Sequence, residues 1–330
     1  MMKTFALAAL AGLAAAGHTM HSDDYDFMAY IAKHGKMYDT VEEYVARFNE
    51  WRKVDRHNKL HNNEKLGWTL EHNHMSDWTH AERQSINGYK AELRTREYAP
   101  VLLEPSNADG VNWVEKGAVT DVKNQGSCGS CWSFSTTGGL EGAHFIATGK
   151  LESFSEEYFV QCDYGTTKNL GCHGGLMDKA FEWAEANAIP TEAAYPYTSG
   201  NGRRGSCDAS KAEGASLKVS AFADVTVNSP EQLKAALDQQ PVSVAIQANK
   251  LVFQMYHTGV ITGTKCGTNL DHGVLAVGYG VENGTEYYLV KNSWGATWGD
   301  QGYVKIGVED GAGVCGIQSG LPSYPTTNSN

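Results

Sequence analysis

The sequence predicts an α+β protein whose chain begins with helical patterning, continues through a helical half and ends in a β-rich half. Apolar residues recur at helical spacing between residues 40 and 54, and again from Cys131 to about Asn187. From Ala215 onward, short apolar runs bounded by turn residues are typical of β-strands. Candidate functional residues occur in both halves, so we expect them to meet in a cleft between the two.

The composition excludes several classes of protein. The chain has 330 residues, of which 41% are hydrophobic, which is enough for one large core or two and too many for a disordered chain. Residues 107–330 carry 14 Lys and Arg against 23 Asp and Glu, and so hold most of the net charge of −11. An acidic body without a basic run argues against nucleic acid as a partner.

Residues 1–17 have the order of a cleavable secretory signal peptide. Lys3 comes first, then an apolar run from Phe5 to Ala16, then small residues. The alternative is a short buried helix. The run is too short to span a membrane, and no later stretch approaches the roughly 18 to 20 apolar residues of a membrane helix. We therefore expect a protein of the secretory pathway, in a lysosome-like or vacuole-like acidic compartment or outside the cell, with no membrane association after processing.

Two helices are predicted after the signal peptide. The first runs from Ser22 to Lys33, with Ser22 as its N-cap and Gly35 just past its end. The second opens with a capping box, Thr40-x-x-Glu43, and one face of it is apolar: Tyr44, Val45, Phe48, Trp51 and Val54. Pro100 and Pro105 then bracket a polar segment that we expect to be an exposed linker, with the folded body starting near Asn107.

Histidines are concentrated before this linker. Eight of the twelve lie before residue 81, seven of them between His21 and His80. They can be exposed helix positions of no consequence. The alternative is a pH switch, because histidine gains its charge between about pH 5 and 7.

The body has its own pattern of elements. Helices are predicted to begin at Cys131, at Ser155 and near Leu176, the last with one buried face made of Leu176, Ala180, Phe181 and Ala184. Strand signals cover residues 241–248, 273–280, 286–292 and 302–306. Asn283-Gly284 predicts a tight hairpin turn between two of these strands.

All seven cysteines lie in the body, and their number is odd. In an oxidising compartment three disulfides would leave one free thiol, although the spacing alone permits many pairings. Cys128-x-x-Cys131 is formally a dithiol redox motif, and Cys162, Cys172 and His173 could form part of a zinc site. The redox alternative is weak, because no early βαβ pattern precedes the dithiol motif. The zinc alternative is weak, because there is no second pair of residues at ligand spacing.

The stretch Gln125-Gly126-Ser127-Cys128-Gly129-Ser130-Cys131-Trp132 resembles the nucleophile segment of papain-like cysteine proteases. His272 follows Cys131 by 141 positions and Asn292 follows it by 161, which is the spacing typical of that family. The resemblance implies a papain-like two-subdomain fold, with a helical subdomain, a β-barrel-like subdomain and the active site in the cleft. It divides the chain into residues 1–17 (signal peptide), 18–106 (a helical, inhibitory pro-segment) and 107–330 (the peptidase domain, with its helical half at about 107–214 and its β half at about 215–330).

The predicted pro-segment carries two partial family motifs. Glu43, Arg47, Trp51 and Asn62 match the interspersed helix motif, whereas Val54 and Asn58 depart from it. Asn73-x-Met75-x-Asp77 resembles the second motif, with methionine in the usual aromatic place and Glu71 where glycine is usual. The pro-segment is thus expected to bind and inhibit the peptidase domain of its own chain.

The resemblance also assigns the chemistry. It implies disulfides between Cys128 and Cys172, Cys162 and Cys207, and Cys266 and Cys315, with Cys131 left as the nucleophile. His272 would be the acid and base, Asn292 would orient its ring, Trp294 would cover this pair, and Gln125 would bind the oxyanion. A thiolate at a helix N-terminus beside an imidazolium would rest as an ion pair. We expect a monomer that needs neither metal nor organic cofactor and acts on protein and peptide substrates.

Substrate residues follow by matched position. Gly174 and Gly175 would pair with the substrate backbone, and Asp271 would lie beside it. The pocket for the second residue before the scissile bond would be formed by Leu176, Met177, Ala245, Leu270 and Gly273, with Gly320 at its far end. This lining predicts a cathepsin L-like endopeptidase with a hydrophobic or aromatic preference, and with no acidic residue in the pocket to select arginine. A papain-fold binding or inhibitory module is the alternative from another class of function.

Overall fold

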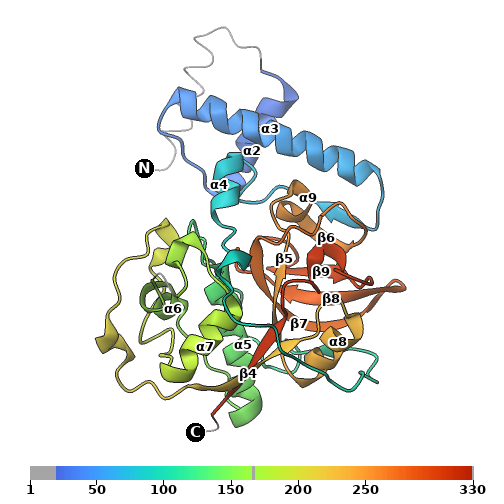
Figure 1. The fold of residues 1–330 in the computed structure, drawn as a ribbon. Coiled ribbons are helices and arrows are strands. Elements are labelled where there is room, and N and C mark those ends of the chain that lie inside the picture. The colour runs from blue at the N-terminus through green and yellow to red at the C-terminus, as the bar shows by residue number, and fades with distance from the viewer. Residues whose placement is uncertain (1–19, 166–167, 329–330) are drawn as a thin grey trace.

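The computed structural model describes residues 20–165 and 168–328, and shows a helical N-terminal segment lying across one end of a two-part body (Figure 1). The body has helices on one side and a large sheet on the other, which confirms the predicted α+β fold with a helical half and a β half. The predicted signal peptide lies outside the described residues and stays a prediction. Among the described helices, none is long and apolar enough to cross a membrane.

The N-terminal segment is built on two packed helices, α2 (Ser22–His34) and α3 (Val41–Asn63). They enclose an aromatic cluster whose buried members are Phe27, Tyr30, Tyr44 and Trp51. Helix α2 ends at Gly35, whose φ of 60° is in the left-handed region that favours glycine. Its predicted N-cap was wrong by one residue, because His21 is the cap and Asp24 accepts a hydrogen bond from the His21 amide.

The capping box predicted for α3 is only half formed. The Thr40 side chain accepts a hydrogen bond from the Glu43 amide, as predicted. The Glu43 carboxylate instead accepts from the Asp39 amide at 3.2 Å, one residue before the position that a capping box requires. Glu43 also lies 3.7 Å from Arg47, so its carboxylate is held by two groups on the same end of the helix.

A short strand attaches this segment to the body. Strand β1 (Trp68–Leu70) pairs antiparallel with β6 (Tyr256–Ile261) and extends the main sheet. The Asn62 side chain binds both backbone groups of Leu70, the last residue of the strand, at 2.9 Å. After α4 (His80–Ser85) the chain runs through the cleft, forms the 3-10 turn η1 (Ala91–Leu93), and pairs through β2 (Pro100–Val101) with β4 (Val219–Val225).

The helical half contains the three predicted helices. Helix α5 (Cys131–Thr148) is central and almost wholly buried along its first three turns, with α6 (Glu156–Cys162) and α7 (Met177–Ala186) packed beside it. Ser155 caps α6 by accepting a hydrogen bond from the Tyr158 amide. Three 3-10 turns complete this half: η2 (Gly171–His173), η3 (Ser199–Asn201) and η4 (Ala209–Ala212).

The β half is one sheet in the order β1-β6-β9-β8-β7-β5-β10-β4-β2. The four predicted strand runs are confirmed within two residues at each end: β5 (Val242–Ile246), β7 (His272–Glu282), β8 (Thr285–Lys291) and β9 (Tyr303–Gly307). The remaining elements are β4 (Val219–Val225), α8 (Pro230–Gln239), α9 (Leu251–Gln254), η5 (Val314–Gly316) and β10 (Ser323–Thr327). The turn at Asn283-Gly284 has positive φ at both residues, 50° and 81°, as the hairpin prediction requires.

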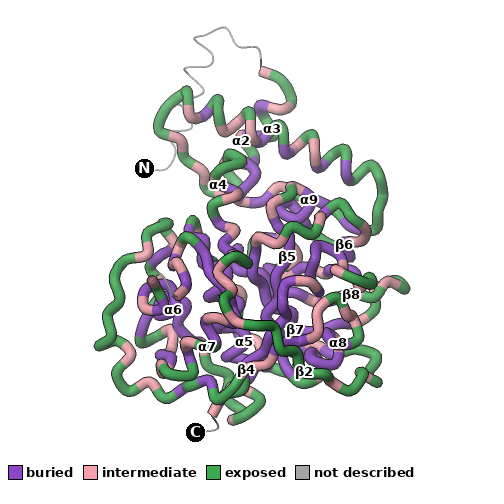
Figure 2. Tube along the Cα trace, viewed as in Figure 1, coloured by how far each residue is buried: buried purple, intermediate pink, exposed green. Residues whose placement is uncertain are grey.

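The two halves are not separated strictly by residue number. Strand β3 (Val111–Asn112), near the start of the body, pairs with β7 and so belongs to the sheet. Figure 2 shows buried residues concentrated along α5 and β7, where the two halves meet. Buried elements from both halves thus lie at this junction.

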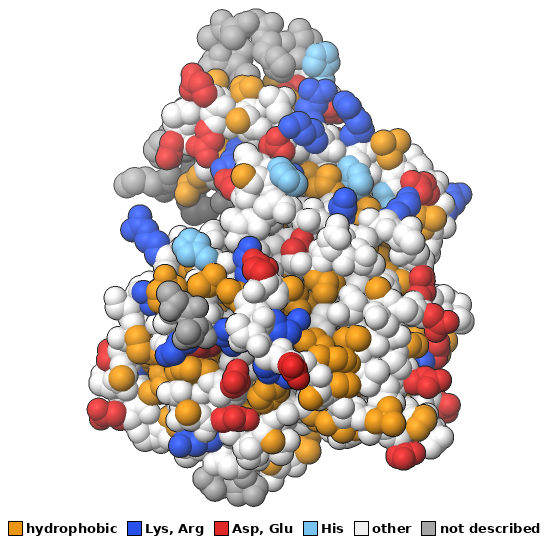
Figure 3. All heavy atoms as spheres, in the orientation of Figure 1, with side chains coloured by type: hydrophobic (Ala, Val, Ile, Leu, Met, Phe, Trp, Pro, Cys, Tyr) orange, Lys and Arg blue, Asp and Glu red, His pale blue; other side chains and the backbone are white. Residues whose placement is uncertain are grey.

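In the view of Figure 3, basic and histidine side chains gather on the N-terminal segment, and acidic ones are frequent along one edge of the body.

Candidate active site

Cys131 is the first residue of α5 and is completely buried. All seven cysteines are described, and it is the free one, since Cys128 is joined to Cys172, Cys162 to Cys207 and Cys266 to Cys315. These are the pairs that the family resemblance implies. The dithiol alternative is therefore wrong, because Cys128 is bonded to Cys172 and not to Cys131. The zinc alternative is also wrong, because Cys162 and Cys172 are both in disulfides and have no thiolate to bind a metal.

His272 is the first residue of β7, next to the residue that contacts this cysteine. Its Nε2 lies 2.8 Å from Oδ1 of Asn292, and its Nδ1 makes no hydrogen bond to any described residue. Because the amide oxygen of Asn292 can only accept, Nε2 carries the proton and Nδ1 keeps its lone pair when the ring is neutral. The next residue, Gly273, donates its backbone N–H to Cys131 Sγ at 3.3 Å, so the chain holds the ring beside the thiol.

Trp294 shields the histidine pair from water. Its ring centroid lies 4.7 Å from that of His272, at an interplanar angle of 32°, and its side chain is buried. Trp294 in turn packs against Phe253 and Trp298, which belong to the core of the β half. Trp294 thus both covers His272 and packs in the core of the β half.

Gln125 brings a side-chain amide to the same place. Its Oε1 accepts a hydrogen bond from Ser293 Oγ at 2.7 Å, which turns Nε2 toward the cleft. Nε2 donates at 2.7 Å to the carbonyl oxygens of Cys128 and of Ile86. The structure therefore brings together the four residues that the sequence singled out, Gln125, Cys131, His272 and Asn292.

The pro-segment covers this cluster with its backbone. Gly88 donates its N–H to Cys131 Sγ at 3.2 Å, while Ile86, two residues earlier, places its carbonyl oxygen on the Gln125 amide. A Cβ added at Gly88 would lie 1.9 Å from the carbonyl oxygen of Gly129, so only glycine permits this approach. The atom that faces the sulfur is an amide nitrogen and not a carbonyl carbon.

Gly175 pairs with the backbone that crosses the cleft. It donates its N–H to the Gly88 carbonyl at 2.8 Å and accepts the Lys90 N–H at 3.1 Å, which forms a parallel bridge opposite Tyr89. The Tyr89 N–H donates to the carbonyl of Asp271 at 2.9 Å on the other wall. Gly174 adjoins this pairing, where an added Cβ would meet the Gly88 carbonyl at 2.6 Å.

Tyr89 fills the predicted pocket. Its side chain is 4% exposed and belongs to one apolar cluster with Leu176, Met177 and Ala245, against which Leu270 packs. Its hydroxyl donates to the carbonyl of Gly320 at 2.9 Å, so Gly320 lies at the far end as expected. Gly273 borders the wall near Met177, where an added Cβ would be 3.0 Å from the methionine sulfur.

An acidic residue lies near the far end of this predicted pocket. Asp178, directly after Met177, is linked to the Tyr89 hydroxyl through Arg94 of the pro-segment. Asp178 has no distinctive context in the sequence, since an acidic side chain in the first turn of a helix is ordinary. Only the fold shows that this first turn borders the pocket.

Burial sets the protonation of the covered cluster. It raises the pKa of Cys131 to about 11 and lowers that of His272 to about 4. Between these values the covered groups favour their neutral forms, because burial removes the water that would stabilise a thiolate and an imidazolium. The Gly88 backbone contributes to the burial of the Cys131 sulfur.

A buried charge network behind the site escaped the sequence analysis. Lys123 lies 2.8 Å from Glu141 and 2.6 Å from Glu156, both almost completely buried. Lys291, which directly precedes Asn292, donates to the carbonyl and hydroxyl of Thr120. Burial lowers the pKa of Lys291 to about 8. Isolated lysines and glutamates resemble solvated positions in a sequence, so no signal there could have revealed this network.

The comparisons with known proteins agree with this geometry. A family model described as papain family cysteine protease matches residues 107–326. The chain belongs to the papain family. A second family model, the cathepsin propeptide inhibitor domain, matches residues 27–82. This papain-family chain is therefore a proform whose N-terminal segment contains an inhibitor domain.

Relatives and solved structures extend over both parts of the chain. The cysteine proteinase RD21A of Arabidopsis thaliana is 40% identical over 312 residues, covering 92% of this chain and 66% of its own length. The cysteine protease XCP2 of Arabidopsis thaliana is 41% identical over 310 residues, which cover 91% of this chain and 85% of XCP2. The chain thus spans just under two thirds of the RD21A length.

Solved proforms share the fold of the whole chain. A recombinant stem bromelain precursor superimposes with a TM-score of 0.82 at 33% identity, covering 93% of this chain and 99% of its own. The proform of Amb a 11, a ragweed pollen cysteine protease, gives a TM-score of 0.82 at 34% identity and covers 94% of this chain and 98% of its own.

Among the described residues, no group of three or more His, Cys, Asp or Glu side chains could hold a metal ion.

Proposed function

We propose that this protein is a cysteine endopeptidase, made as a zymogen, that hydrolyses peptide bonds through the Cys131 thiolate. One observation carries the proposal: the free thiol at the start of α5, the oriented His272 ring and the Gln125 amide converge where the chain's own backbone already lies. A nucleophile, a base held by a third group, and an amide donor together form the constellation of acyl transfer.

Activation begins when the pro-segment leaves the cleft. Water then reaches Cys131 and His272, and the desolvation that favours their neutral forms is relieved. The positive end of α5 stabilises a thiolate at its first residue, and the proton passes to His272 Nδ1. The released enzyme rests as a thiolate and imidazolium pair.

In the acylation step the Cys131 sulfur attacks the carbonyl carbon of the substrate. A carbon–sulfur bond forms, and the negative charge moves to the carbonyl oxygen, which accepts hydrogen bonds from Gln125 Nε2 and the Cys131 N–H. The imidazolium of His272 donates its proton to the departing amine as the carbon–nitrogen bond breaks. The products are a thioester and a free amine.

In the deacylation step His272 removes a proton from a water molecule. The resulting hydroxide adds to the thioester carbonyl, the carbon–sulfur bond breaks, and a carboxylic acid leaves. Asn292 keeps the ring oriented in both steps by accepting the Nε2 hydrogen. Neutral asparagine does this without adding a charge that would compete with the thiolate.

The pro-segment inhibits because it follows the substrate path without presenting a cleavable bond to the sulfur. Gly88 offers its N–H to Sγ and directs its carbonyl to Gly175 instead. The Ile86 carbonyl occupies the Gln125 donor that the oxyanion would need. Tyr89 fills the apolar pocket, which supports a preference for an aromatic or hydrophobic side chain at the second residue before the scissile bond.

The location that fits this chemistry is the secretory pathway, ending in a vacuole-like or lysosome-like compartment or outside the cell. A KDEL-tailed cysteine endopeptidase of Arabidopsis thaliana, CEP2, is 43% identical over 307 residues and covers 87% of this chain and 81% of its own length. Three disulfides are consistent with an oxidising environment.

The function is tested by labelling and peptide cleavage with one preparation. After acid activation, a thiol-reactive epoxide should label Cys131 alone and in one-to-one stoichiometry, and the same preparation should cleave a diverse peptide library between pH 4 and 7.5. Aromatic or aliphatic residues should dominate at the second position before the cut. A folded protein that neither labels at Cys131 nor cleaves would instead be a binding module.

We expect acid to loosen the pro-segment partly through His74. Burial, followed by nearby Lys36 and His34, lowers the pKa of His74 to about 4. In the unfolded segment the pKa of this histidine is near 6.5, so between about pH 6.5 and 4 the unfolded segment binds more protons than the folded one. The folded segment therefore has its full stability above about pH 6.5 and loses part of it as the pH falls toward 4. Replacing His74 by glutamine should lower the midpoint of acid release by roughly a few tenths of a pH unit.

The release midpoint can be followed by the onset of peptide cleavage in a pH series. A matched control is His80→Gln, because His80 is exposed and should leave the midpoint unchanged. An equal shift in both variants, or none in either, would remove His74 from the explanation of acid release.

A further inference from the structure

Two buried carboxylates of the body are bound by two arginines of the pro-segment. Arg94 Nε and Arg96 Nη2 each lie 3.3 Å from Asp178 Oδ2, in the first turn of α7. Arg96 also donates with Nη1 to Asp224 Oδ2 at 2.6 Å and with Nη2 to the other oxygen of the same carboxylate. The body thus contains a guanidinium-binding site that is occupied by its own chain.

The site is built to hold a planar cation. Asp224 receives Arg96 through both of its oxygens, which is the paired geometry that guanidinium groups favour and ammonium groups cannot match. The Arg96 guanidinium also lies over the ring of Phe222 on β4, 4.9 Å from its centroid. The side chains of Asp178 and Asp224 are 5% and 1% exposed.

This site adjoins the far end of the substrate pocket. The Tyr89 hydroxyl, which reaches Gly320 at that end, lies 3.3 Å from Nη2 of Arg94. The guanidinium held by Asp178 therefore already touches the tip of the side chain in the pocket. In Figure 1 the segment that carries these arginines crosses the face of the body near α7 and β4.

Removal of the pro-segment takes both cations away and leaves both carboxylates. Buried or half-buried carboxylates without a cation are costly, so they attract a replacement. Lys179, the next residue on α7, binds the Leu93 carbonyl in the covered form. Neighbouring residues on a helix point about 100° apart, so Lys179 is poorly directed to replace the arginines at Asp178.

We propose that Asp178, with Asp224 behind it, makes the far end of this pocket a subsite for a guanidinium group. The released enzyme then accepts arginine, as well as aromatic residues, at the second position before the scissile bond, and prefers arginine to lysine. The inference rests on the proposed peptidase function, because only release of the pro-segment opens the subsite.

The test uses four peptides that differ only at the second position before the cut: phenylalanine, arginine, lysine and citrulline. Citrulline has nearly the shape of arginine without its charge, so the arginine-to-citrulline ratio of kcat/KM isolates the electrostatic contribution. We expect a ratio of about ten or more in the native enzyme, falling with added salt. Asp178→Asn should bring the ratio close to one.

Active-site titration and the phenylalanine peptide show whether each variant is folded and active. Asp224→Asn, which leaves the pocket lining intact, should lower the arginine ratio by a smaller factor. The inference is overturned if the native enzyme does not distinguish arginine from citrulline, or if Asp178→Asn leaves their ratio unchanged. No cleavage of any of the four peptides would instead contradict the proposed function.

Discussion

Replacing Cys131 by alanine is expected to lower kcat for peptide hydrolysis by about 10⁴-fold or more, because no other group at the site can form the thioester. The loss should appear in kcat, since Gly175 and the apolar pocket still bind the substrate. The measurement is steady-state cleavage of a phenylalanine peptide by the released variant, with trace native enzyme used for processing and then inactivated by the epoxide.

The same variant should fold normally. Cys131 Sγ accepts backbone hydrogen bonds, among them those from Gly88 and Gly273, and takes part in no disulfide. Its pro-form should therefore retain all three disulfides and a thermal midpoint within a few degrees of the native value. Asn292→Ala is the graded comparison, because it removes the orienting group and leaves the nucleophile. Residual activity within tenfold of native in a fully processed Cys131 variant would show that the nucleophile has been misassigned.

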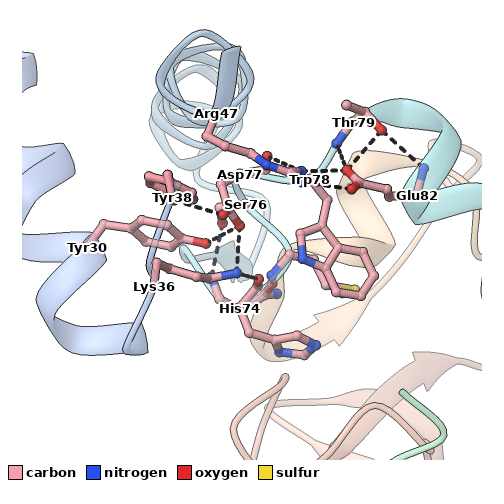
Figure 4. A network of polar contacts seen from close by, with 12 residues as sticks. Tyr30, Lys36, Tyr38, Arg47, His74, Ser76, Asp77, Trp78, Thr79 and Glu82 are labelled. Atoms are coloured by element: carbon pink, nitrogen blue, oxygen red, sulfur yellow. Dashed lines mark hydrogen bonds and ion pairs between the residues drawn. The ribbon is translucent and has the colours of Figure 1, made fainter. Parts of the chain in front are cut away.

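Replacing Asp77 by alanine is expected to release the pro-segment at neutral pH. Asp77 is the centre of the polar network in Figure 4: its Oδ1 accepts from Tyr30 at 2.7 Å and Lys36 at 2.8 Å, and its Oδ2 accepts from Tyr38 at 2.9 Å. The side chains of Asp77 and Lys36 are 3% and 17% exposed. Loss of the carboxylate leaves the Tyr30 and Tyr38 hydroxyls without their acceptor, and leaves the Lys36 ammonium bound to the His74 carbonyl without a counterion.

Breaking a buried ion pair of this kind costs about 3 kcal/mol or more, which corresponds to an open population raised by roughly 100-fold. The variant pro-form should therefore cleave peptides at pH 7 without acid treatment. Arg47 and Glu82, which join α3 to α4 at 2.6 and 2.8 Å beside this network, would limit the damage to local opening.

Asp23→Ala is the matched control, because Asp23 forms an ion pair with Arg52 in which the side chains are 37% and 46% exposed. Such surface pairs contribute at most about 1 kcal/mol, so this variant should stay latent at pH 7. Equal leakage from both variants would show that latency does not depend on the buried network.

The sequence predicted those parts of the molecule that local chemistry determines. The start of α5 at Cys131, the Asn283-Gly284 turn and the buried face of α7 each depend on neighbours within a few residues. The family spacing pointed to His272 and Asn292, which the fold brings together as the adjacent ends of paired strands β7 and β8.

Apart from details of the helix caps, the contacts that the sequence did not predict are long-range. Pairing of β1 with β6 joins residues nearly 190 positions apart, and nothing in a three-residue strand identifies its partner. Arg94 and Arg96 lie in a segment without strong periodicity, so their partners Asp178 and Asp224 could not be foreseen. Seating of Tyr89 in the pocket likewise depends on the path of the whole pro-segment through the cleft.

The central claim is that the pro-segment keeps Cys131 protonated and covered, and that its release creates a reactive thiolate. The direct measurement is the rate of alkylation of Cys131 by iodoacetamide as a function of pH, before and after release. The pro-form should react appreciably only as the pH approaches the raised thiol pKa of about 11, whereas the released enzyme should react readily at pH 5. Equal alkylation of both forms at pH 5 would contradict the account.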